Sequence, residues 1–325
     1  MKPALRLFPV LLLLALASAT VPAFADTEGH FERTLSVSGP VDVTVQTGSG
    51  TVAVRRGDSG KVEIHGTIHA SNHRDGADVE ARIREIEAHP PIEQEGNKIR
   101  IGHFDEHERE RHISISYVLT VPAESKVRTE SGSGDQSIEG ISGPVDASSG
   151  SGSLRLANIG NEARVRTGSG EITLSEIRGS VHATAGSGTI HATGIMGGLN
   201  ASSGSGNIHL EQTATGDVEI STGSGEIEIR GVKGGVRAST GSGSIHAQGQ
   251  PTGEWRLRSG SGNVAVEFPR GAAFDLAARS SSGNIETSHE IAVQGSLSSR
   301  ELRGKVNGGG VLVDLSTSSG TIEVR

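Results

Sequence analysis

The stretch from Ala163 to Gly179, ARVRTGSGEITLSEIRG, decides the fold. Apolar and polar residues alternate on both sides of its Gly-Ser-Gly, which is the two-residue period of a β-strand. The motif recurs at a nearly constant spacing, and its first glycine is Gly132, Gly150, Gly168, Gly186, Gly204, Gly223, Gly241 and Gly260. A unit this short cannot bury its apolar side alone, so the period predicts a stack of coils.

Glycine- and serine-rich sequence is also typical of flexible linkers. A linker has no reason to keep an isoleucine two positions after a turn, and five units do so: Ile172, Ile190, Ile208, Ile227 and Ile245. We therefore predict an all-β, single-stranded parallel β-helix, or solenoid, with about 18 residues per coil. A right-handed coil is favoured over a left-handed one.

Three further features of the repeat carry structural expectations. The glycines are expected at turns that require positive φ. Trp255 aligns with Val236 and Val218, so we expect it in the core. Hydroxyl residues directly before the glycines share the parity of the core, and we expect them to bond turn amides or one another along the stack. They are Ser131, Ser149, Thr167, Ser203, Thr222, Thr240 and Ser259.

Residues 1–25 have the three regions of a secretory signal peptide: basic Lys2 and Arg6, a short apolar run, and Ala23-Phe24-Ala25. Cleavage is expected between Ala25 and Asp26. The apolar run is shorter than the roughly 20 residues that span a bilayer, and no later segment is long enough. We expect an exported chain, periplasmic or at the cell surface, whose mature form has no transmembrane segment.

Composition limits the classes of partner. The chain has no cysteine, so disulfides cannot stabilise it. Aromatic residues make up only 2%, which predicts a thin core of Ala, Val, Ile and Leu. A formal net charge of −8 without a basic stripe argues against nucleic acid or anionic membrane surfaces as partners.

The repeat is interrupted near its start and decays at its end. Residues 26–325 are expected to form one solenoid domain, with residues 71–126 inserted as a cap. Within the insert, an amphipathic pattern predicts a helix over 75–89, and residues 98–101 and 113–121 are expected to pair as a hairpin. After Gly262 the copies weaken, and residues 307–325 predict a last, atypical coil.

The chain resembles the bacterial DUF4097 family of adhesin-like proteins. The resemblance rests on the signal peptide, the split first coils, the strand SYVLTVP (Ser116 to Pro122), the repeated Ser-Gly-x-Ile coils and the Asn307 to Gly310 ending. It covers essentially the whole mature chain. It implies a single-stranded β-solenoid at the cell envelope and offers no catalytic motif.

Motifs for catalysis and cofactor binding are not found. The sequence lacks the glycine patterns of nucleotide-binding loops. The position of the aspartate in calcium-binding β-rolls is isoleucine here, and isoleucine has no oxygen to bind Ca²⁺. Outward glutamates lie one per coil, as expected of a solvated face. We therefore expect no catalytic residue and no cofactor.

One outward column could hold a metal ion, since imidazole and carboxylate groups bind Zn²⁺ and Cu²⁺. Its weak candidate ligands are His191, His209, Glu228 and His246. Equivalent residues of adjacent coils stack, so we expect His191 and His209 to be neighbours. The structural alternative is an ordinary solvated ladder, and it is favoured.

These observations predict a non-catalytic, adhesin-like binding or structural module of the cell envelope, with an unidentified polymer or protein as its partner. Two alternatives stay open. One is a carbohydrate-active enzyme of the β-helix type, which needs paired carboxylates in a cleft. The other is an accessory protein of the envelope stress response.

Overall fold

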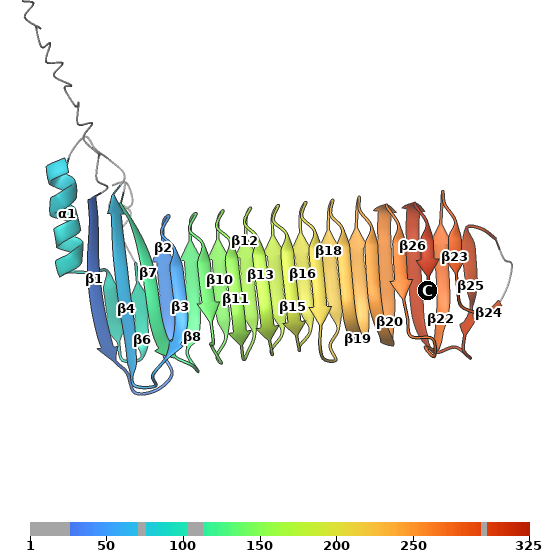
Figure 1. Cartoon of the computed structure of the whole chain (residues 1–325), viewed down its shortest axis with the longest axis horizontal. Coiled ribbons are helices and arrows are strands. Elements are labelled where there is room, and N and C mark those ends of the chain that lie inside the picture. The colour runs from blue at the N-terminus through green and yellow to red at the C-terminus, as the bar shows by residue number, and fades with distance from the viewer. Residues whose placement is uncertain (1–26, 71–75, 103–112, 294–297) are drawn as a thin grey trace, which may run out of the picture.

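The computed structural model describes residues 27–70, 76–102, 113–293 and 298–325. These residues form one long rod of stacked coils (Figure 1). The expected signal peptide and its cleavage site between Ala25 and Asp26 lie outside the described residues. Within the described ranges, no helix is long and apolar enough to cross a membrane.

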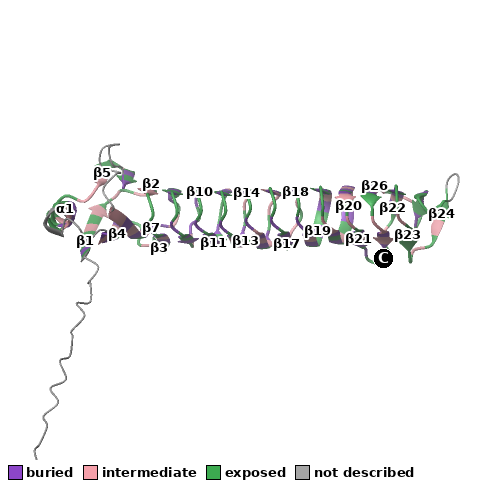
Figure 2. Cartoon of the chain, turned by 90° about the horizontal axis from the view of Figure 1, so that it is seen from above, coloured by how far each residue is buried: buried purple, intermediate pink, exposed green. Residues whose placement is uncertain are grey.

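Each coil contributes one strand to each of two parallel ladders, which form the broad sides of the rod (Figure 2). Face A contains β8 (Lys126–Ser131), β10 (Val145–Ser149), β12 (Ala163–Thr167), β14 (Val181–Ala185), β16 (Leu199–Ser203) and β18 (Val218–Thr222). Face B contains β9 (Gln136–Glu139), β11 (Leu154–Ile159), β13 (Ile172–Ile177), β15 (Ile190–Ile195) and β17 (Ile208–Gln212). The long strands β19 (Ile227–Thr240) and β20 (Ile245–Ser261) contribute to both faces.

The pairing register follows the sequence period. Ile172 pairs with Ile190, and Ile190 pairs with Ile208, the equivalent residue of the next coil. Ile208 is completely buried, whereas Asn207 beside it is exposed. The predicted parallel solenoid and the inward position of the isoleucines are therefore confirmed, while the hand of the coil stays a prediction.

Trp255 lies in the core, as expected. It is completely buried, and its ring contacts Phe268 edge-on, with 5.0 Å between the ring centroids. The indole Nε1 donates a hydrogen bond of 3.0 Å to the carbonyl oxygen of Gly234. This bond satisfies the one polar atom that the large side chain brings into the core.

The hydroxyl column before the glycines links the turns of successive coils. Thr167 Oγ1 donates to the carbonyl oxygen of Gly152 in the preceding coil (3.0 Å) and accepts from the amide of Gly170 in its own turn (3.1 Å). Ser203 makes the corresponding pair of bonds to Gly188 and Gly206. The expected bonds to turn amides are confirmed, and Ala185 is the one position between Thr167 and Ser203 where the column lacks a hydroxyl.

The glycines of these turns serve close approach rather than positive φ. None of the described Gly-Ser-Gly glycines has positive φ, and the expectation that they do is wrong. A Cβ atom on Gly170 would lie 2.0 Å from the carbonyl oxygen of Gly152, and one on Gly168 would lie 2.3 Å from that of Gly150. Each turn therefore stacks directly on the one before, and a side chain at these positions would separate the coils.

At the N-terminal end, the coils do not stack in sequence order. The first coil, β2 (Asp42–Thr47) and β3 (Val52–Gly57), pairs on one side with β8 and β9. On its other side it pairs with β6 (Lys98–Ile101) and β7 (Ile113–Pro122), which come later in the chain. The first coil in sequence is therefore enclosed between two later ones.

The expected hairpin between residues 98–101 and 113–121 is wrong. β6 pairs antiparallel with β5 (Ile92–Glu95), and β7 pairs antiparallel with β4 (Lys61–Ala70). β6 and β7 belong to opposite faces because each continues a different ladder of the first coil. β4 in turn pairs with β1 (Thr27–Ser36), the outermost strand of face B.

The expected helix is present as α1 (Gly76–Ala88), which lies against β1 at the N-terminal end of the rod (Figure 1). Its apolar residues Ile83 and Ile86 are each only 4% exposed. Arg33 in β1 donates hydrogen bonds to the carbonyl oxygens of Glu87 and Ala88, at 3.1 and 3.2 Å. These bonds satisfy carbonyl groups that the end of a helix leaves free.

At the C-terminal end, the order is changed again. The last coil, β26 (Val311–Ser319) and β27 (Ile322–Val324), lies between β20 with β21 (Val264–Glu267) and β22 (Phe274–Ser280) with β23 (Ile285–Thr287). β25 (Glu301–Val306) and β24 (Ile291–Val293) extend face A outward by antiparallel pairing. The atypical coil of residues 307–325 is last in sequence, as predicted, but it is internal in space.

Candidate functional site

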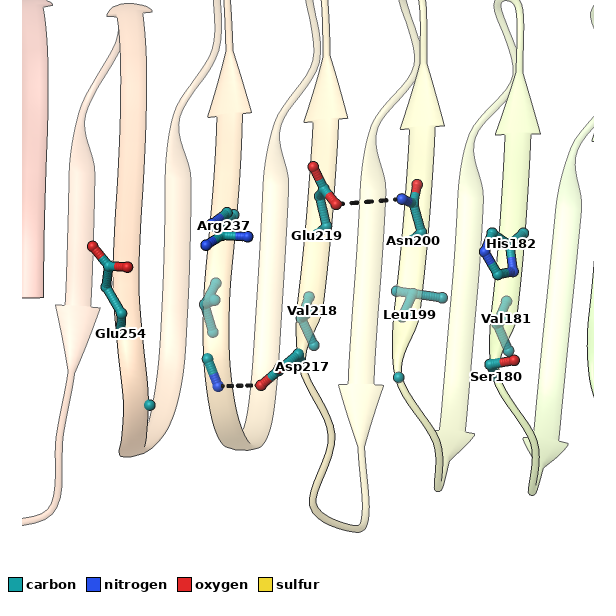
Figure 3. Close-up of a pocket in the computed structure, with 14 residues that line it drawn as sticks. Ser180, Val181, His182, Leu199, Asn200, Asp217, Val218, Glu219, Arg237 and Glu254 are labelled. Carbon is teal, nitrogen blue, oxygen red and sulfur yellow. Dashed lines mark hydrogen bonds between the residues drawn. The ribbon is translucent and has the colours of Figure 1, made fainter. Parts of the chain in front are cut away.

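Face A carries a groove of about 420 Å³ that follows the rod axis across β14, β16, β18, β19 and β20 (Figure 3). Two rows of outward positions line the groove, and most of the five strands contribute one residue to each row. The first row directly precedes the first inward residue of each face A segment and consists of Ser180, Gly198, Asp217, Gly235 and Glu254. The second row lies two residues further along each segment and consists of His182, Asn200, Glu219 and Arg237.

The groove exists because two glycines interrupt its first row. Neither Gly198 nor Gly235 has positive φ, so the backbone does not require glycine there. A Cβ on Gly198 would come no closer than 3.2 Å to another atom, and one on Gly235 no closer than 3.1 Å. By contrast, a Cβ on the adjacent Gly197 would lie 2.4 Å from the carbonyl oxygen of Gly179. Gly197 is needed for stacking, whereas a Cβ on Gly198 or Gly235 would make a tight contact with Asp217 that a shift of a few tenths of an ångström relieves.

The polar groups of the groove are mostly free of ion pairs. Asp217 Oδ1 accepts a hydrogen bond of 2.9 Å from the amide of Gly235, and Asn200 Nδ2 donates to Glu219 Oε2 at 3.4 Å (Figure 3). Arg237 has no hydrogen bond or ion pair from its side chain to any described residue. The row therefore presents an imidazole, an amide, a carboxylate and a guanidinium group to solvent, one per coil.

Sequence reasoning missed this groove, although two signals mark it. One is the doublet Gly197-Gly198, repeated as Gly234-Gly235, where other coils have a single glycine, or Asn161, followed by a larger residue. The other is the longer step from Gly204 to Gly223, which lengthens the connection between β17 and β18. The sequence period is defined by the isoleucines and the Gly-Ser-Gly turns. It does not show that another outward column lacks side chains in some of the coils.

The histidine column on face B is arranged as the sequence predicted. His191 pairs in register with His209, His209 with Glu228, and Glu228 with His246. The rings of His191 and His209 stack with centroids 4.8 Å apart and planes 4° from parallel. His209 Nδ1 lies 3.0 Å from Glu228 Oε2, and this hydrogen bond is the main cause that lowers the pKa of the Glu228 carboxyl group.

The stack does not direct the two rings at one metal ion. The lone pairs of imidazole nitrogens lie in the ring plane, and two parallel planes do not meet. His246 lies beyond Glu228, with its Nε2 3.7 Å from Glu226 Oε1. Over the described ranges, no three His, Cys, Asp or Glu side chains are grouped to hold a metal. Metal binding by His191 and His209 stays a hypothesis, which zinc titration of the native chain against a His191→Ala, His209→Ala variant would test.

Comparisons with solved structures find chains of similar extent at low identity. One is a "putative adhesin" from Bacteroides fragilis, with 12% identity, 91% of this chain and 97% of that chain covered, and a TM-score of 0.31. Another is a "putative lipid binding protein" from Parabacteroides distasonis, with 14% identity, the same coverage and a TM-score of 0.42. A third is a "putative cell adhesion protein" from Clostridium sporogenes, with 11% identity, 91% and 99% coverage, and a TM-score of 0.19.

Among curated proteins, no sequence matches this chain. The sequence profile described as Toastrack DUF4097 matches residues 164–325. This range begins in β12 and includes the groove, the histidine column and the enclosed last coil. Through these residues, the chain belongs to the Toastrack DUF4097 family.

Proposed function

We propose that this protein is an exported, non-catalytic β-solenoid of the cell envelope that binds a polymer or a protein in the manner of an adhesin. The observation that carries the proposal is the groove on face A. It repeats polar groups at the pitch of the coils over consecutive strands, as recognition of an extended partner requires. The signal peptide expected at residues 1–25 supports export to the periplasm or the cell surface.

The N-terminal end of the rod fits this role. We propose that residues 26–325 act as one domain and that the insert 71–126 caps it. Support comes from α1, which lies against β1 and buries Ile83 and Ile86. A covered end prevents the edge strands of one rod from pairing with those of another, so the rod would present its broad faces to partners.

Co-sedimentation with cell-envelope fragments tests the proposal. The purified chain is expected to sediment with the fragments and to reach saturation as its concentration rises. A chain carrying Ile208→Asp, in which the core of the stack is disrupted, controls for non-specific sedimentation. A native chain that remains in the supernatant, or that sediments no better than this variant, would contradict the proposal.

Export is tested separately, by fractionating cells that produce the full-length chain and sequencing the N-terminus of the exported form. The expected result is a mature chain that begins at Asp26. An intact N-terminus in the cytoplasmic fraction would exclude export.

A further inference from the structure

We propose that the groove on face A binds a linear, uncharged polysaccharide that lies along the rod axis. The inference rests on the proposed function and deepens it by naming the site and the chemical class of the partner. Its support comes from the shape of the groove, its hydrogen-bonding groups and its charge.

The shape favours a linear polymer. Neighbouring strands of a ladder lie about 4.8 Å apart, so a groove across five strands is about 19 Å long. The coil pitch is close to the length of one pyranose residue in an extended chain. Successive sugar residues would therefore meet successive coils, in the order His182, Asn200, Glu219 and Arg237.

The hydrogen-bonding groups suit sugar hydroxyls. The Asn200 amide offers a donor and an acceptor, the Glu219 carboxylate offers two acceptor oxygens, and the Arg237 guanidinium offers paired donors. Hydroxyl groups both donate and accept, so a pair of neighbouring hydroxyls can bond any of these planar groups at two points. Because Arg237 has no partner among the described residues, a ligand would not have to displace an existing ion pair there.

The charge favours an uncharged chain. Asp217 and Glu219 have no cation within ion-pair distance among the described residues, and Glu254 is paired with Arg256. A polyanion would be repelled by both free carboxylates and attracted by only one unpaired cation in the described part of the groove, Arg237. A polycation would be repelled by Arg237, which pairs in register with Glu219 on one side and with the cationic Arg256 on the other. An uncharged polyol meets neither repulsion.

Gly198 and Gly235 provide a way to close the groove, because a side chain at either position requires Asp217 to shift by only a few tenths of an ångström. Glutamates stand at the equivalent position of other coils, at Glu162 and Glu254, so the fold accommodates a long side chain there. The variant Gly198→Gln, Gly235→Gln would fill the empty positions. Thr173→Gln places the same side chain at an outward position of face B and serves as the matched control.

Isothermal titration of the purified chain tests the inference with three hexasaccharides: cellohexaose and hexa-N-acetylchitohexaose, which are uncharged, and hexagalacturonate, which is anionic. At least one uncharged hexasaccharide should bind with a Kd of about 1 mM or tighter. Its affinity should fall about tenfold or more in the Gly198→Gln, Gly235→Gln variant and stay unchanged in Thr173→Gln. Hexagalacturonate should not bind.

A second variant guards against a folding defect in the first. Asn200→Ala, Arg237→Ala shortens two exposed side chains and should weaken binding similarly while leaving circular dichroism unchanged. The inference is overturned if the native chain binds neither uncharged hexasaccharide, if it binds only hexagalacturonate, or if both groove variants bind as the native chain does.

The two proposals fail in distinguishable ways. A chain that sediments with envelope fragments but binds neither uncharged hexasaccharide keeps the proposed function and refutes the glycan inference. A chain that does not sediment with envelope fragments refutes the proposed function, whatever the titrations show.

Discussion

The middle of the rod and its two ends are built from the same kind of coil but are ordered differently. From β8 to β20, each coil stacks on the one that precedes it in sequence. At each end, one coil lies between two coils that are not both adjacent to it in the sequence. The first coil lies between the coils of β6 and β8, and the last lies between those of β20 and β22. A repeat thus specifies contacts between adjacent copies, whereas the ends are fixed by pairing between distant segments.

The difference has an energetic consequence. In the middle, the stability of the stack is close to a sum of coil and neighbour contributions, so a coil can be removed at the cost of one layer. At the ends, the enclosed coil holds an outer coil in place. Removing an enclosed coil therefore leaves two strand surfaces exposed.

Removing β26 and β27 should have the largest effect. Truncation after Gly310 is expected to unfold residues 274–293 and 298–306 as well, because β22 and β23 lose their parallel partners. Deleting Gly186 to Ser203 should remove one layer and leave the rest protected. Hydrogen exchange of the two variants tests the comparison, and it would be contradicted if the internal deletion exposed more of the chain than the truncation.

A charge placed in the core of the middle region should have the second-largest effect on stability. Ile208→Asp buries an unpaired carboxylate and is expected to cost about 4 kcal/mol of unfolding free energy. Asn207→Asp, at the exposed position just before Ile208, should change the free energy of unfolding by less than about 0.5 kcal/mol. Thermal unfolding of both variants measures the difference, and equal losses would refute the register of face B.

The close stacking of the turns predicts a smaller effect. Gly170→Ala places a Cβ 2.0 Å from the carbonyl oxygen of Gly152, and separating the two turns should cost about 2 kcal/mol. Gly198→Ala, where the nearest atom is 3.2 Å away, requires a shift of only a few tenths of an ångström and should cost much less. If urea denaturation gave the same loss for both, close approach would not explain the glycines of the turns.

The smallest effect is a gain in stability. Ala185→Ser would place a hydroxyl near the amide of Gly188 and the carbonyl oxygen of Gly170, as Ser203 does one coil later. Stabilisation of about 1 kcal/mol is expected. Thr167→Ala removes the same pair of bonds and should lose a similar amount. A destabilising Ala185→Ser would show that the column has another role.

The sequence predicts the middle of the rod well because every determinant there is local or periodic. The isoleucines, the hydroxyl column and Trp255 all follow from the alternation within one coil and its repetition. The role of the turn glycines was misjudged because positive φ can be proposed from one turn, whereas contact with the preceding turn depends on the distance between coils.

The order of coils at the ends could not be predicted by the same reasoning. Val43 pairs with Val127, far along the chain, and no period links the two positions. The groove was missed for a related reason, since it results from absent side chains at Gly198 and Gly235. The histidine neighbours were found because they occupy the column in which the period was read.

Disulfide formation in the C-terminal region tests the out-of-order stacking most directly. Because the native chain has no cysteine, only the introduced cysteines can form a bond. Arg258 in β20 and Arg279 in β22 both pair in register with Ser316 in β26. We expect Arg258→Cys to form a disulfide with Ser316→Cys, and Arg279→Cys to do the same. Arg258→Cys and Arg279→Cys together should not, because two ladder spacings, about 10 Å, exceed the reach of a disulfide. A bond between those two, with none to position 316, would contradict the account.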